Sequence, residues 1–120
     1  MKFENIIDEL LNQFPILNKD YEREKNYIEG LAYPCFETIF VKYINEMCLE
    51  NNIEELKKIC FFIEICISSN DEKVSQLIIV AVLEGILPNR EAIQILKKYA
   101  LTVTLQHINE LEKLYGWSKA

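Results

Sequence analysis

Apolar residues near the start of the chain recur three and four positions apart, which is the spacing of a helix with one apolar face. Pro15 follows this run directly. Proline lacks the backbone N–H and its ring clashes with the preceding turn, so it ends a helix. The pattern predicts a first helix whose apolar face is made by Phe3, Ile6, Ile7, Leu10, Leu11 and Phe14.

The next segment, residues 16–33, leaves helix and loop both open. Asp20 could cap a short charged helix that runs through Ile28 and is closed by Gly30, or the segment could form a loop. From Pro34 the pattern is clear again, because proline is well tolerated in the first turn of a helix. The apolar stripe of this helix comprises Phe36, Phe40, Tyr43, Ile44 and Met47. We expect Asn52 to cap the helix that follows.

The central part of the chain, residues 53–87, is apolar on nearly all sides. At about 100° per residue, Phe61 and Ile65 fall almost opposite the main face of the first central helix, and Val80 and Leu83 project from the other side of the second. Such helices are packed on two sides, or leave one side for a partner. The two main faces consist of Leu56, Ile59, Cys60, Ile63, Cys66 and Ile67, and of Val74, Ile78, Ala81, Val82 and Gly85.

Two more helices are predicted after the break "LPN", the first capped by Asn89 and the second starting at Thr102 or Thr104 and ending at Gly116. No segment alternates with a period of two over a convincing length. The sequence therefore predicts an all-α fold of five to six antiparallel helices, in a single helical domain that spans residues 1–120.

The stretch "LKKICFFIEICISSNDEKVSQLIIVAVLEGIL", Leu56 to Leu87, resembles one repeat of the HEAT or armadillo-like class. In that class an Asp followed three residues later by Val opens the second helix, and Asp71 and Val74 match this pattern. The resemblance covers about a quarter of the chain, and a HEAT array needs several repeats to bury its core. It implies HEAT-like helical hairpins packed in a compact right-handed array or bundle.

The motifs "FFIE", "VLEGIL" and "LYGW" also resemble those of a group of small bacterial proteins of uncharacterised function. Some members of that group are similar to immunity proteins that accompany secreted toxins. The resemblance implies a cytoplasmic protein that binds and blocks another protein, and it assigns no functional residues.

The chain has 120 residues, of which 50% are hydrophobic, and a formal net charge of −6. This acidity opposes binding to nucleic acids and anionic membranes and suits a basic protein partner. We expect no membrane span, because Glu64 and Glu84 interrupt the longest apolar stretches, and no secretory signal. No C-x-x-C pair occurs, so we expect buried thiols in a reducing compartment, the cytoplasm, at Cys35, Cys48, Cys60 and Cys66.

Glu64 and Glu84 are the candidate acid pair for an enzyme. Their expected offset along the central hairpin is about 12 Å, too far for two carboxylates that work on one bond. We interpret them as carboxylates at helix edges, with Lys57 and Lys58 close enough to pair with Glu84. His107 is the only histidine, and its surroundings signal neither a metal site nor a triad. We expect no cofactor, no metal and no enzymatic activity.

The residues that favour a partner surface are aromatic, apolar and acidic. Tyrosine is a favoured interface anchor, and Phe61 and Ile65 need a second packing surface from other helices or from another chain. We predict an acidic edge with nearby tyrosines as anchors. The predicted partner-binding residues are Glu46, Glu50, Glu54, Glu55, Phe61, Ile65, Tyr21, Tyr27 and Tyr33.

Three functions follow as hypotheses. The first is a non-enzymatic protein-binding module, such as an immunity-type inhibitor of a basic toxin domain. The second is a self-associating structural or regulatory protein, which would be a homo-oligomer. The third is an enzyme that uses Glu64 or Glu84 as acid or base.

Overall fold

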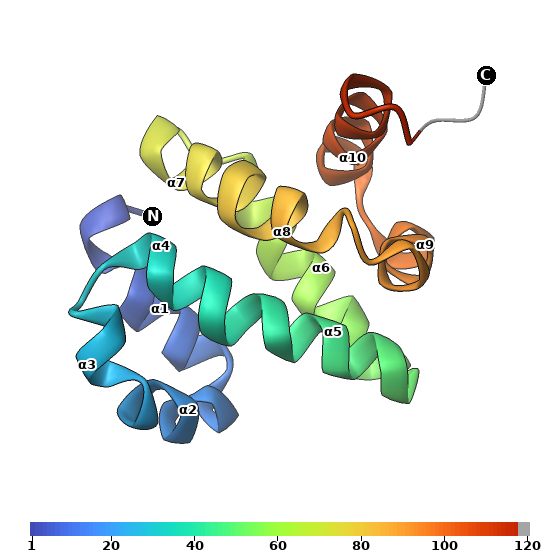
Figure 1. Cartoon of the computed structure of the whole chain (residues 1–120). Helices are drawn as coiled ribbons and strands as arrows, with labels where there is room; N and C mark the ends of the chain where they lie inside the picture. Colours follow the sequence, from blue (N-terminus) through green and yellow to red (C-terminus); the bar gives the residue numbers. More distant parts are fainter. Residues whose placement is uncertain (118–120) are drawn as a thin grey trace.

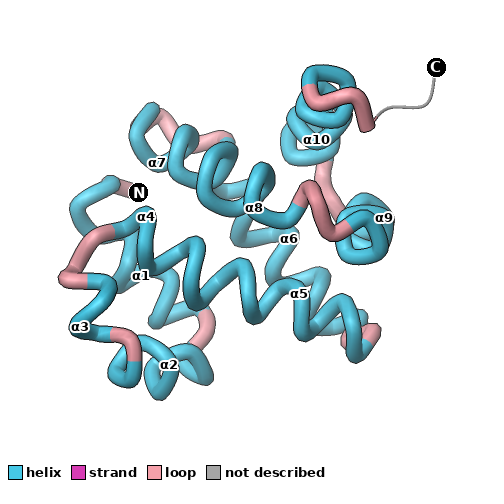
Figure 2. The backbone as a smooth tube through the Cα atoms, viewed as in Figure 1, coloured by secondary structure: helices cyan, strands magenta, loops and turns pink. Residues whose placement is uncertain are grey.

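The computed structural model describes residues 1–117, and this part of the chain is helical almost throughout, without a strand. The all-α prediction is confirmed (Figures 1 and 2). The predicted number of helices was too low, because the described residues form eight continuous helical segments rather than five or six. The additional helices come from the segment that the sequence left open.

The first predicted helix is present. A 3₁₀ turn, η1 (Phe3–Asn5), leads into α1 (Ile6–Gln13), and Phe14 leaves the helix before Pro15. Pro15 itself starts the 3₁₀ turn η2 (Pro15–Leu17), which continues into α2 (Asn18–Arg23). Proline therefore ends one helix and opens the next, as its fixed φ and missing N–H allow.

The uncertain segment is helical. After α2 comes α3 (Lys25–Ile28), which ends at Glu29 and Gly30, both at positive φ (50° and 71°). Gly30 thus closes the helix as expected. The predicted cap was wrong, because Asp20 lies inside α2, where it pairs with Arg23 at 3.0 Å.

Three long helices form the centre of the molecule. The first runs without a break through α4 (Ala32–Cys35), the π-type stretch η3 (Phe36–Phe40) and α5 (Val41–Glu50). The second is α6 (Ile53–Ile67), and the third runs through α7 (Glu72–Leu77), the π-type stretch η4 (Ile78–Leu83) and α8 (Glu84–Ile86). The first and third run side by side in the same direction, and α6 runs back behind them and packs against both (Figure 1).

Asparagine and aspartate side chains set the starts of three helices, as predicted. Asn52 accepts a hydrogen bond from the backbone N–H of Glu55, and Asp71 accepts one from Lys73. Asn89 accepts one from Ala92 at the start of α9 (Arg90–Tyr99). Each bond satisfies an N–H that the first turn of a helix leaves without a partner. The last helix, α10 (Thr102–Leu114), has no such cap of its own.

An aromatic cluster joins the N-terminal segment to the long helices. The Phe14 ring centroid lies 5.6 Å from that of Phe40 on η3 and 5.6 Å from that of Phe62 on α6. Tyr43 on α5 lies 6.0 Å away in an edge-on arrangement. Offset and edge-on contacts at these distances are favourable. Because Phe14 is 1% exposed, one residue just beyond α1 is wedged between two central helices.

The first and third long helices approach closely at Gly85. A Cβ atom placed on Gly85 would lie 3.3 Å from Cγ2 of Val41, so this glycine permits the close approach of the two helices. Leu83 is fully buried although a spacing of about 100° puts it opposite the main face. It ends the stretch η4, where bonding from i to i+5 changes that spacing.

We predict that Phe14→Ala lowers the free energy of unfolding by about 3–5 kcal/mol, because it leaves a cavity between Phe40 and Phe62. The matched change Phe61→Ala removes the same atoms from a side chain that is 60% exposed, and should cost less than about 1 kcal/mol. Urea unfolding followed by circular dichroism measures both. Equal losses for the two variants would contradict the assignment of Phe14 to the core.

Candidate functional site

The turn between α5 and α6 brings together four carboxylates, which we call the acidic corner: Glu46, Glu50, Glu54 and Glu55. Asn51 takes a left-handed conformation (φ 53°) that ends α5, and Asn52 then caps α6. The first two glutamates lie in the last turns of α5 and the other two in the first turn of α6. A tight turn therefore gathers residues that two separate helices supply.

Tyr43 lies inside this corner and is 8% exposed. Its hydroxyl donates a hydrogen bond to the Glu55 carboxylate. Burial raises the pKa of Tyr43, and so do that hydrogen bond and the negative charges of Glu55, Glu50 and Glu46. Three of the four carboxylates thus act on one buried hydroxyl. Glu55 is half-buried and engaged there, whereas Glu46, Glu50 and Glu54 are exposed to solvent.

Two apolar side chains lie at the same turn, and the sequence reasoning missed both. Leu49 is 86% exposed and Ile53 is 42% exposed. A hollow of about 470 Å³ borders Leu49 along α5, and its charged lining residues are Glu37, Lys42 and Glu46. The available signal was that Leu49 stands outside the apolar stripe of its helix, directly before Glu50. The acidic corner therefore includes an apolar element of its own.

The predicted tyrosines are not beside this corner. Tyr33 lies at the start of the same long helix, 17 residues before Glu50, which is about 25 Å along the axis. Tyr21 and Tyr27 lie in α2 and α3, on the other side of the molecule in Figure 1. Tyr27 is 66% exposed, whereas Tyr21 and Tyr33 are partly buried against the core.

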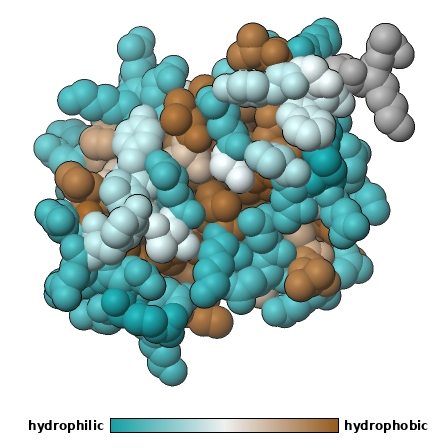
Figure 3. Space-filling model, in the orientation of Figure 1, coloured by the Kyte–Doolittle hydropathy of each residue, from teal (hydrophilic) through white to brown (hydrophobic). Residues whose placement is uncertain are grey.

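Phe61 and Ile65 are neighbours one turn apart on the outward face of α6. They are 60% and 43% exposed, so the rest of the described chain covers each of them only in part. Lys57 and Lys58 are exposed on the preceding turn of the same helix. On the face of the molecule in Figure 3, hydrophobic side chains form separate areas that hydrophilic ones interrupt.

Glu64 caps a helix that lies far away in the sequence. Its carboxylate accepts hydrogen bonds from the backbone N–H groups of Val103 (3.1 Å) and Thr104 (2.9 Å), and from the Thr104 hydroxyl (2.8 Å). It supplies the cap that α10 lacks and holds α10 against α6. The prediction of an edge carboxylate missed this partner, because local spacing carries no information about it.

The surroundings of Glu64 favour its charged form. Burial raises its pKa, but the hydrogen bonds from Thr104 and Val103, together with nearby His107, outweigh burial, and the net pKa is lowered. The positive end of the α10 dipole acts in the same direction. A carboxylate that is held ionised in this way is suited to docking a helix.

Glu84 has a different partner from the one expected. Its carboxylate accepts a hydrogen bond from the Tyr115 hydroxyl at 2.8 Å. The expected pairing with Lys57 or Lys58 is not among the ion pairs of residues 1–117. Lys58 instead places its Nζ atom 5.2 Å from the centre of the Phe14 ring. Glu64 and Glu84 thus both contact the C-terminal part of the chain.

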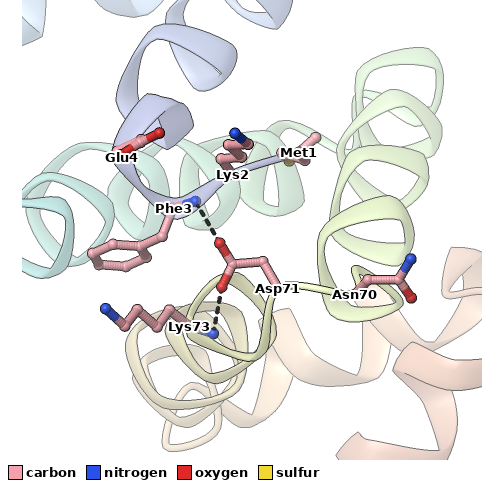
Figure 4. Close-up of a pocket in the computed structure, with 7 residues that line it drawn as sticks. All are labelled: Met1, Lys2, Phe3, Glu4, Asn70, Asp71 and Lys73. Carbon is pink, nitrogen blue, oxygen red and sulfur yellow. Dashed lines mark hydrogen bonds between the residues drawn. The ribbon is translucent and has the colours of Figure 1, made fainter.

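A second hollow, of about 510 Å³, lies where the N-terminus meets the turn before α7 (Figure 4). Asp71 bridges the two segments, because its carboxylate accepts hydrogen bonds from the backbone N–H groups of Phe3 (2.9 Å) and Lys73 (3.0 Å). The bond from Phe3 is the largest cause of the lowered pKa of Asp71. Asp71 therefore attaches the N-terminal segment to the start of α7 beside this hollow.

The cysteines carry no evident chemistry. All four are free and buried, and burial raises the pKa of Cys35, Cys60 and Cys66 to about 12. Among residues 1–117, no group of His, Cys, Asp and Glu side chains could hold a metal ion. No helix in that range combines the length and apolar character that a membrane crossing requires.

Comparison with known proteins identifies the family. Residues 7–116 match a family described as a domain of unknown function, DUF7674. The chain belongs to this family. No curated protein and no solved structure matches the chain. The DUF7674 match runs from α1 to the residue after Tyr115, so it includes the acidic corner, the outward face of α6 and the Glu64 cap.

We predict that Glu64→Ala costs about 1–2 kcal/mol of unfolding free energy at neutral pH, because two backbone N–H groups of α10 lose their acceptor. The folded pKa of Glu64 lies below the ordinary value of 4.5. Its contribution is therefore complete above that value and is lost as the pH falls through the folded pKa. Urea unfolding of wild type and Glu64→Gln between about pH 7 and about pH 3 should give a difference that shrinks in acid.

Glu84→Gln provides the control, because the Glu84 carboxylate accepts one side-chain hydrogen bond and caps no helix. A difference between wild type and Glu64→Gln that stays constant with pH would contradict the ionised cap.

Proposed function

We propose that this DUF7674 domain is a non-enzymatic protein-binding module that docks a basic partner at the acidic corner. The observation that carries the proposal is that Glu46, Glu50 and Glu54 are all exposed near the turn between α5 and α6, where the side chain of Leu49 is also exposed. Charged groups steer and orient a partner, whereas desolvated apolar anchors supply most of the affinity. The corner combines both kinds of group.

The rigidity of the corner supports the same function. Asn52 fixes the start of α6, and the hydrogen bond from Tyr43 to Glu55 ties the two helices together. The helix ends that carry the carboxylates are therefore fixed before a partner arrives, and a preorganised backbone loses less conformational entropy on binding. The net charge of −6 adds long-range attraction for a basic protein.

In its narrower form, we propose an immunity-type inhibitor of a basic toxin domain in the bacterial cytoplasm, built from HEAT-like hairpins. The shared direction of the first and third long helices (Figure 1) supports the hairpin arrangement, in which equivalent helices stack in one layer. The free, buried cysteines support a reducing compartment.

The outward face of α6 favours a second function, self-association. Phe61 and Ile65 present adjacent apolar side chains that the described residues cover only in part. An isologous pair of α6 helices would bury them. In contrast, the third hypothesis, catalysis by Glu64 or Glu84, gains no support from the geometry, because both carboxylates are engaged in hydrogen bonds that fix the C-terminal part of the chain.

We predict that changing Glu46, Glu50 and Glu54 together to lysine slows association with the partner and removes most of its salt dependence. The reason is that rim charges act mainly on the association rate. Glu55 is left unchanged because it binds Tyr43. The partner is first purified from the native host by capture on immobilised wild-type protein. Its binding kinetics are then measured at low and at high salt.

The matched control changes Glu22, Glu29 and Glu110 to lysine, which gives the same net charge at exposed positions of other segments. If both triple variants associate equally slowly, net charge alone is responsible and the assignment to the acidic corner is wrong. An unchanged association rate in the acidic-corner variant would also contradict the assignment of the binding site to this corner.

Self-association predicts a dimer in light scattering at high protein concentration, and conversion to monomer by Phe61→Glu with Ile65→Glu. In a dimer, the two introduced carboxylates would be buried at the interface and would lose their hydration without gaining a partner. Both residues are exposed in the single chain, so the double variant should keep its circular dichroism spectrum. A wild-type monomer at all concentrations rules this second function out.

A further inference from the structure

A cation-rich hollow of about 660 Å³ lies between α9 and α10, apart from the acidic corner. In Figure 1 these two helices lie together at one side of the molecule. The volume is in the range of small-molecule sites. The walls are almost entirely polar side chains, and the lining residues are Arg90, Gln94, Lys97, Asn109, Glu112, Lys113 and Trp117.

A buried carboxylate fixes two of the cations. Glu112 is 4% exposed. It accepts hydrogen bonds from the Arg90 guanidinium and, at 2.6 Å, from the Lys97 ammonium. Burial raises the pKa of Glu112, but these two cations outweigh burial and lower it. Arg90 also donates to the carbonyl oxygen of Leu87 at 2.9 Å, so its position is set on two sides.

Trp117 forms one wall and is also held in place. Gly116 turns the chain at φ 73°. The backbone N–H of Trp117 then donates to the carbonyl oxygen of Glu112 at 2.7 Å, and the backbone N–H of Gly116 donates to the carbonyl oxygen of Lys113. This pair of bonds is the Schellman ending of a helix, which requires a left-handed residue such as glycine. The Trp117 ring lies 4.7 Å from the Arg90 guanidinium, yet remains 44% exposed.

The charges of the hollow match a compact dianion. Arg90, Lys97 and Lys113 supply three formal positive charges and Glu112 removes one, so two remain in a chain whose net charge is −6. The side-chain amides of Gln94 and Asn109 add neutral donors. A phosphate monoester carries about 1.5 to 2 negative charges at neutral pH and has three acceptor oxygens. A carboxylate would leave one of the positive charges unmatched.

We propose that this hollow binds a small organic phosphate that carries a flat ring. The phosphate group contacts Arg90, Lys97 and Lys113, and the ring packs on the exposed part of Trp117. Glu112 acts as a positioning residue, because its carboxylate orients Arg90 and Lys97. The proposal is independent of protein binding at the acidic corner.

Trp117 is the single tryptophan of the chain, so its fluorescence reports on this site directly. The probe is phenyl phosphate, compared with phenol and with inorganic phosphate, and calorimetry provides a second readout. We expect a saturable fluorescence change with phenyl phosphate that weakens as salt is added. Inorganic phosphate should bind more weakly, and phenol should give no saturable change.

Two variants test the residues. Lys113→Ala removes an exposed cation, and Gln94→Glu adds a carboxylate to the lining; each should weaken phenyl phosphate binding about tenfold, the effect of one charge-assisted hydrogen bond. Lys25→Ala, which removes an exposed lysine from α3, should bind like wild type. Urea unfolding verifies that all three variants are folded.

Several results would overturn the proposal. Equal responses to phenyl phosphate and phenol would show that no phosphate site exists, and equal affinities for phenyl phosphate and inorganic phosphate would remove the ring from the ligand. Wild-type affinity in Lys113→Ala or Gln94→Glu would place any binding outside the hollow. No saturable signal from either readout would show that Arg90 and Lys97 serve only to neutralise Glu112.

Discussion

The packing of the other helices around α6 is the constraint on which this fold depends. Seven residues of α6 are buried, and the helix contacts α5, η4, α7, α9 and α10. Phe62 adds the contact to Phe14 at the N-terminal end of the chain. A helix enclosed on so many sides must be apolar around most of its circumference. Phe61 and Ile65 stand out because they are apolar at the one strip where this enclosure is open.

Polar contacts, in contrast, fix the peripheral segments to this centre. Asp71 binds the N–H of Phe3, Glu64 caps α10, and Glu112 links α10 to Arg90 and Lys97 of α9. Each carboxylate reaches an element distant in the sequence or on a neighbouring helix. Apolar contacts tolerate sliding, whereas a carboxylate that accepts two or three hydrogen bonds specifies one position. The apolar centre supplies stability, and these carboxylates set where the outer helices lie.

The sequence predicted those features that depend on local chemistry. Stripes of apolar residues identified the buried faces, and Asn52, Asp71 and Asn89 marked helix starts because a cap acts within its own turn. Segment 16–33 was ambiguous, since short charged helices owe their stability to packing that the sequence does not display. The Glu64 cap and the bond from Tyr43 to Glu55 were missed for a related reason. Both join separate helices, and no spacing along one helix encodes them.

The ion pairs of buried Glu112 with Arg90 and Lys97 differ from the other carboxylate contacts in the free energy of desolvation that they require. Removing a carboxylate and parts of two cations from water is expensive, and their mutual attraction often does no more than offset that cost. Apolar residues could therefore join α9 to α10 with equal or greater stability. What apolar residues could not do is hold Arg90 and Lys97 at fixed positions on the wall of the hollow, beside a tryptophan that a Schellman turn orients. Stability alone does not favour this arrangement, and its fixed cations fit the anion site that we propose.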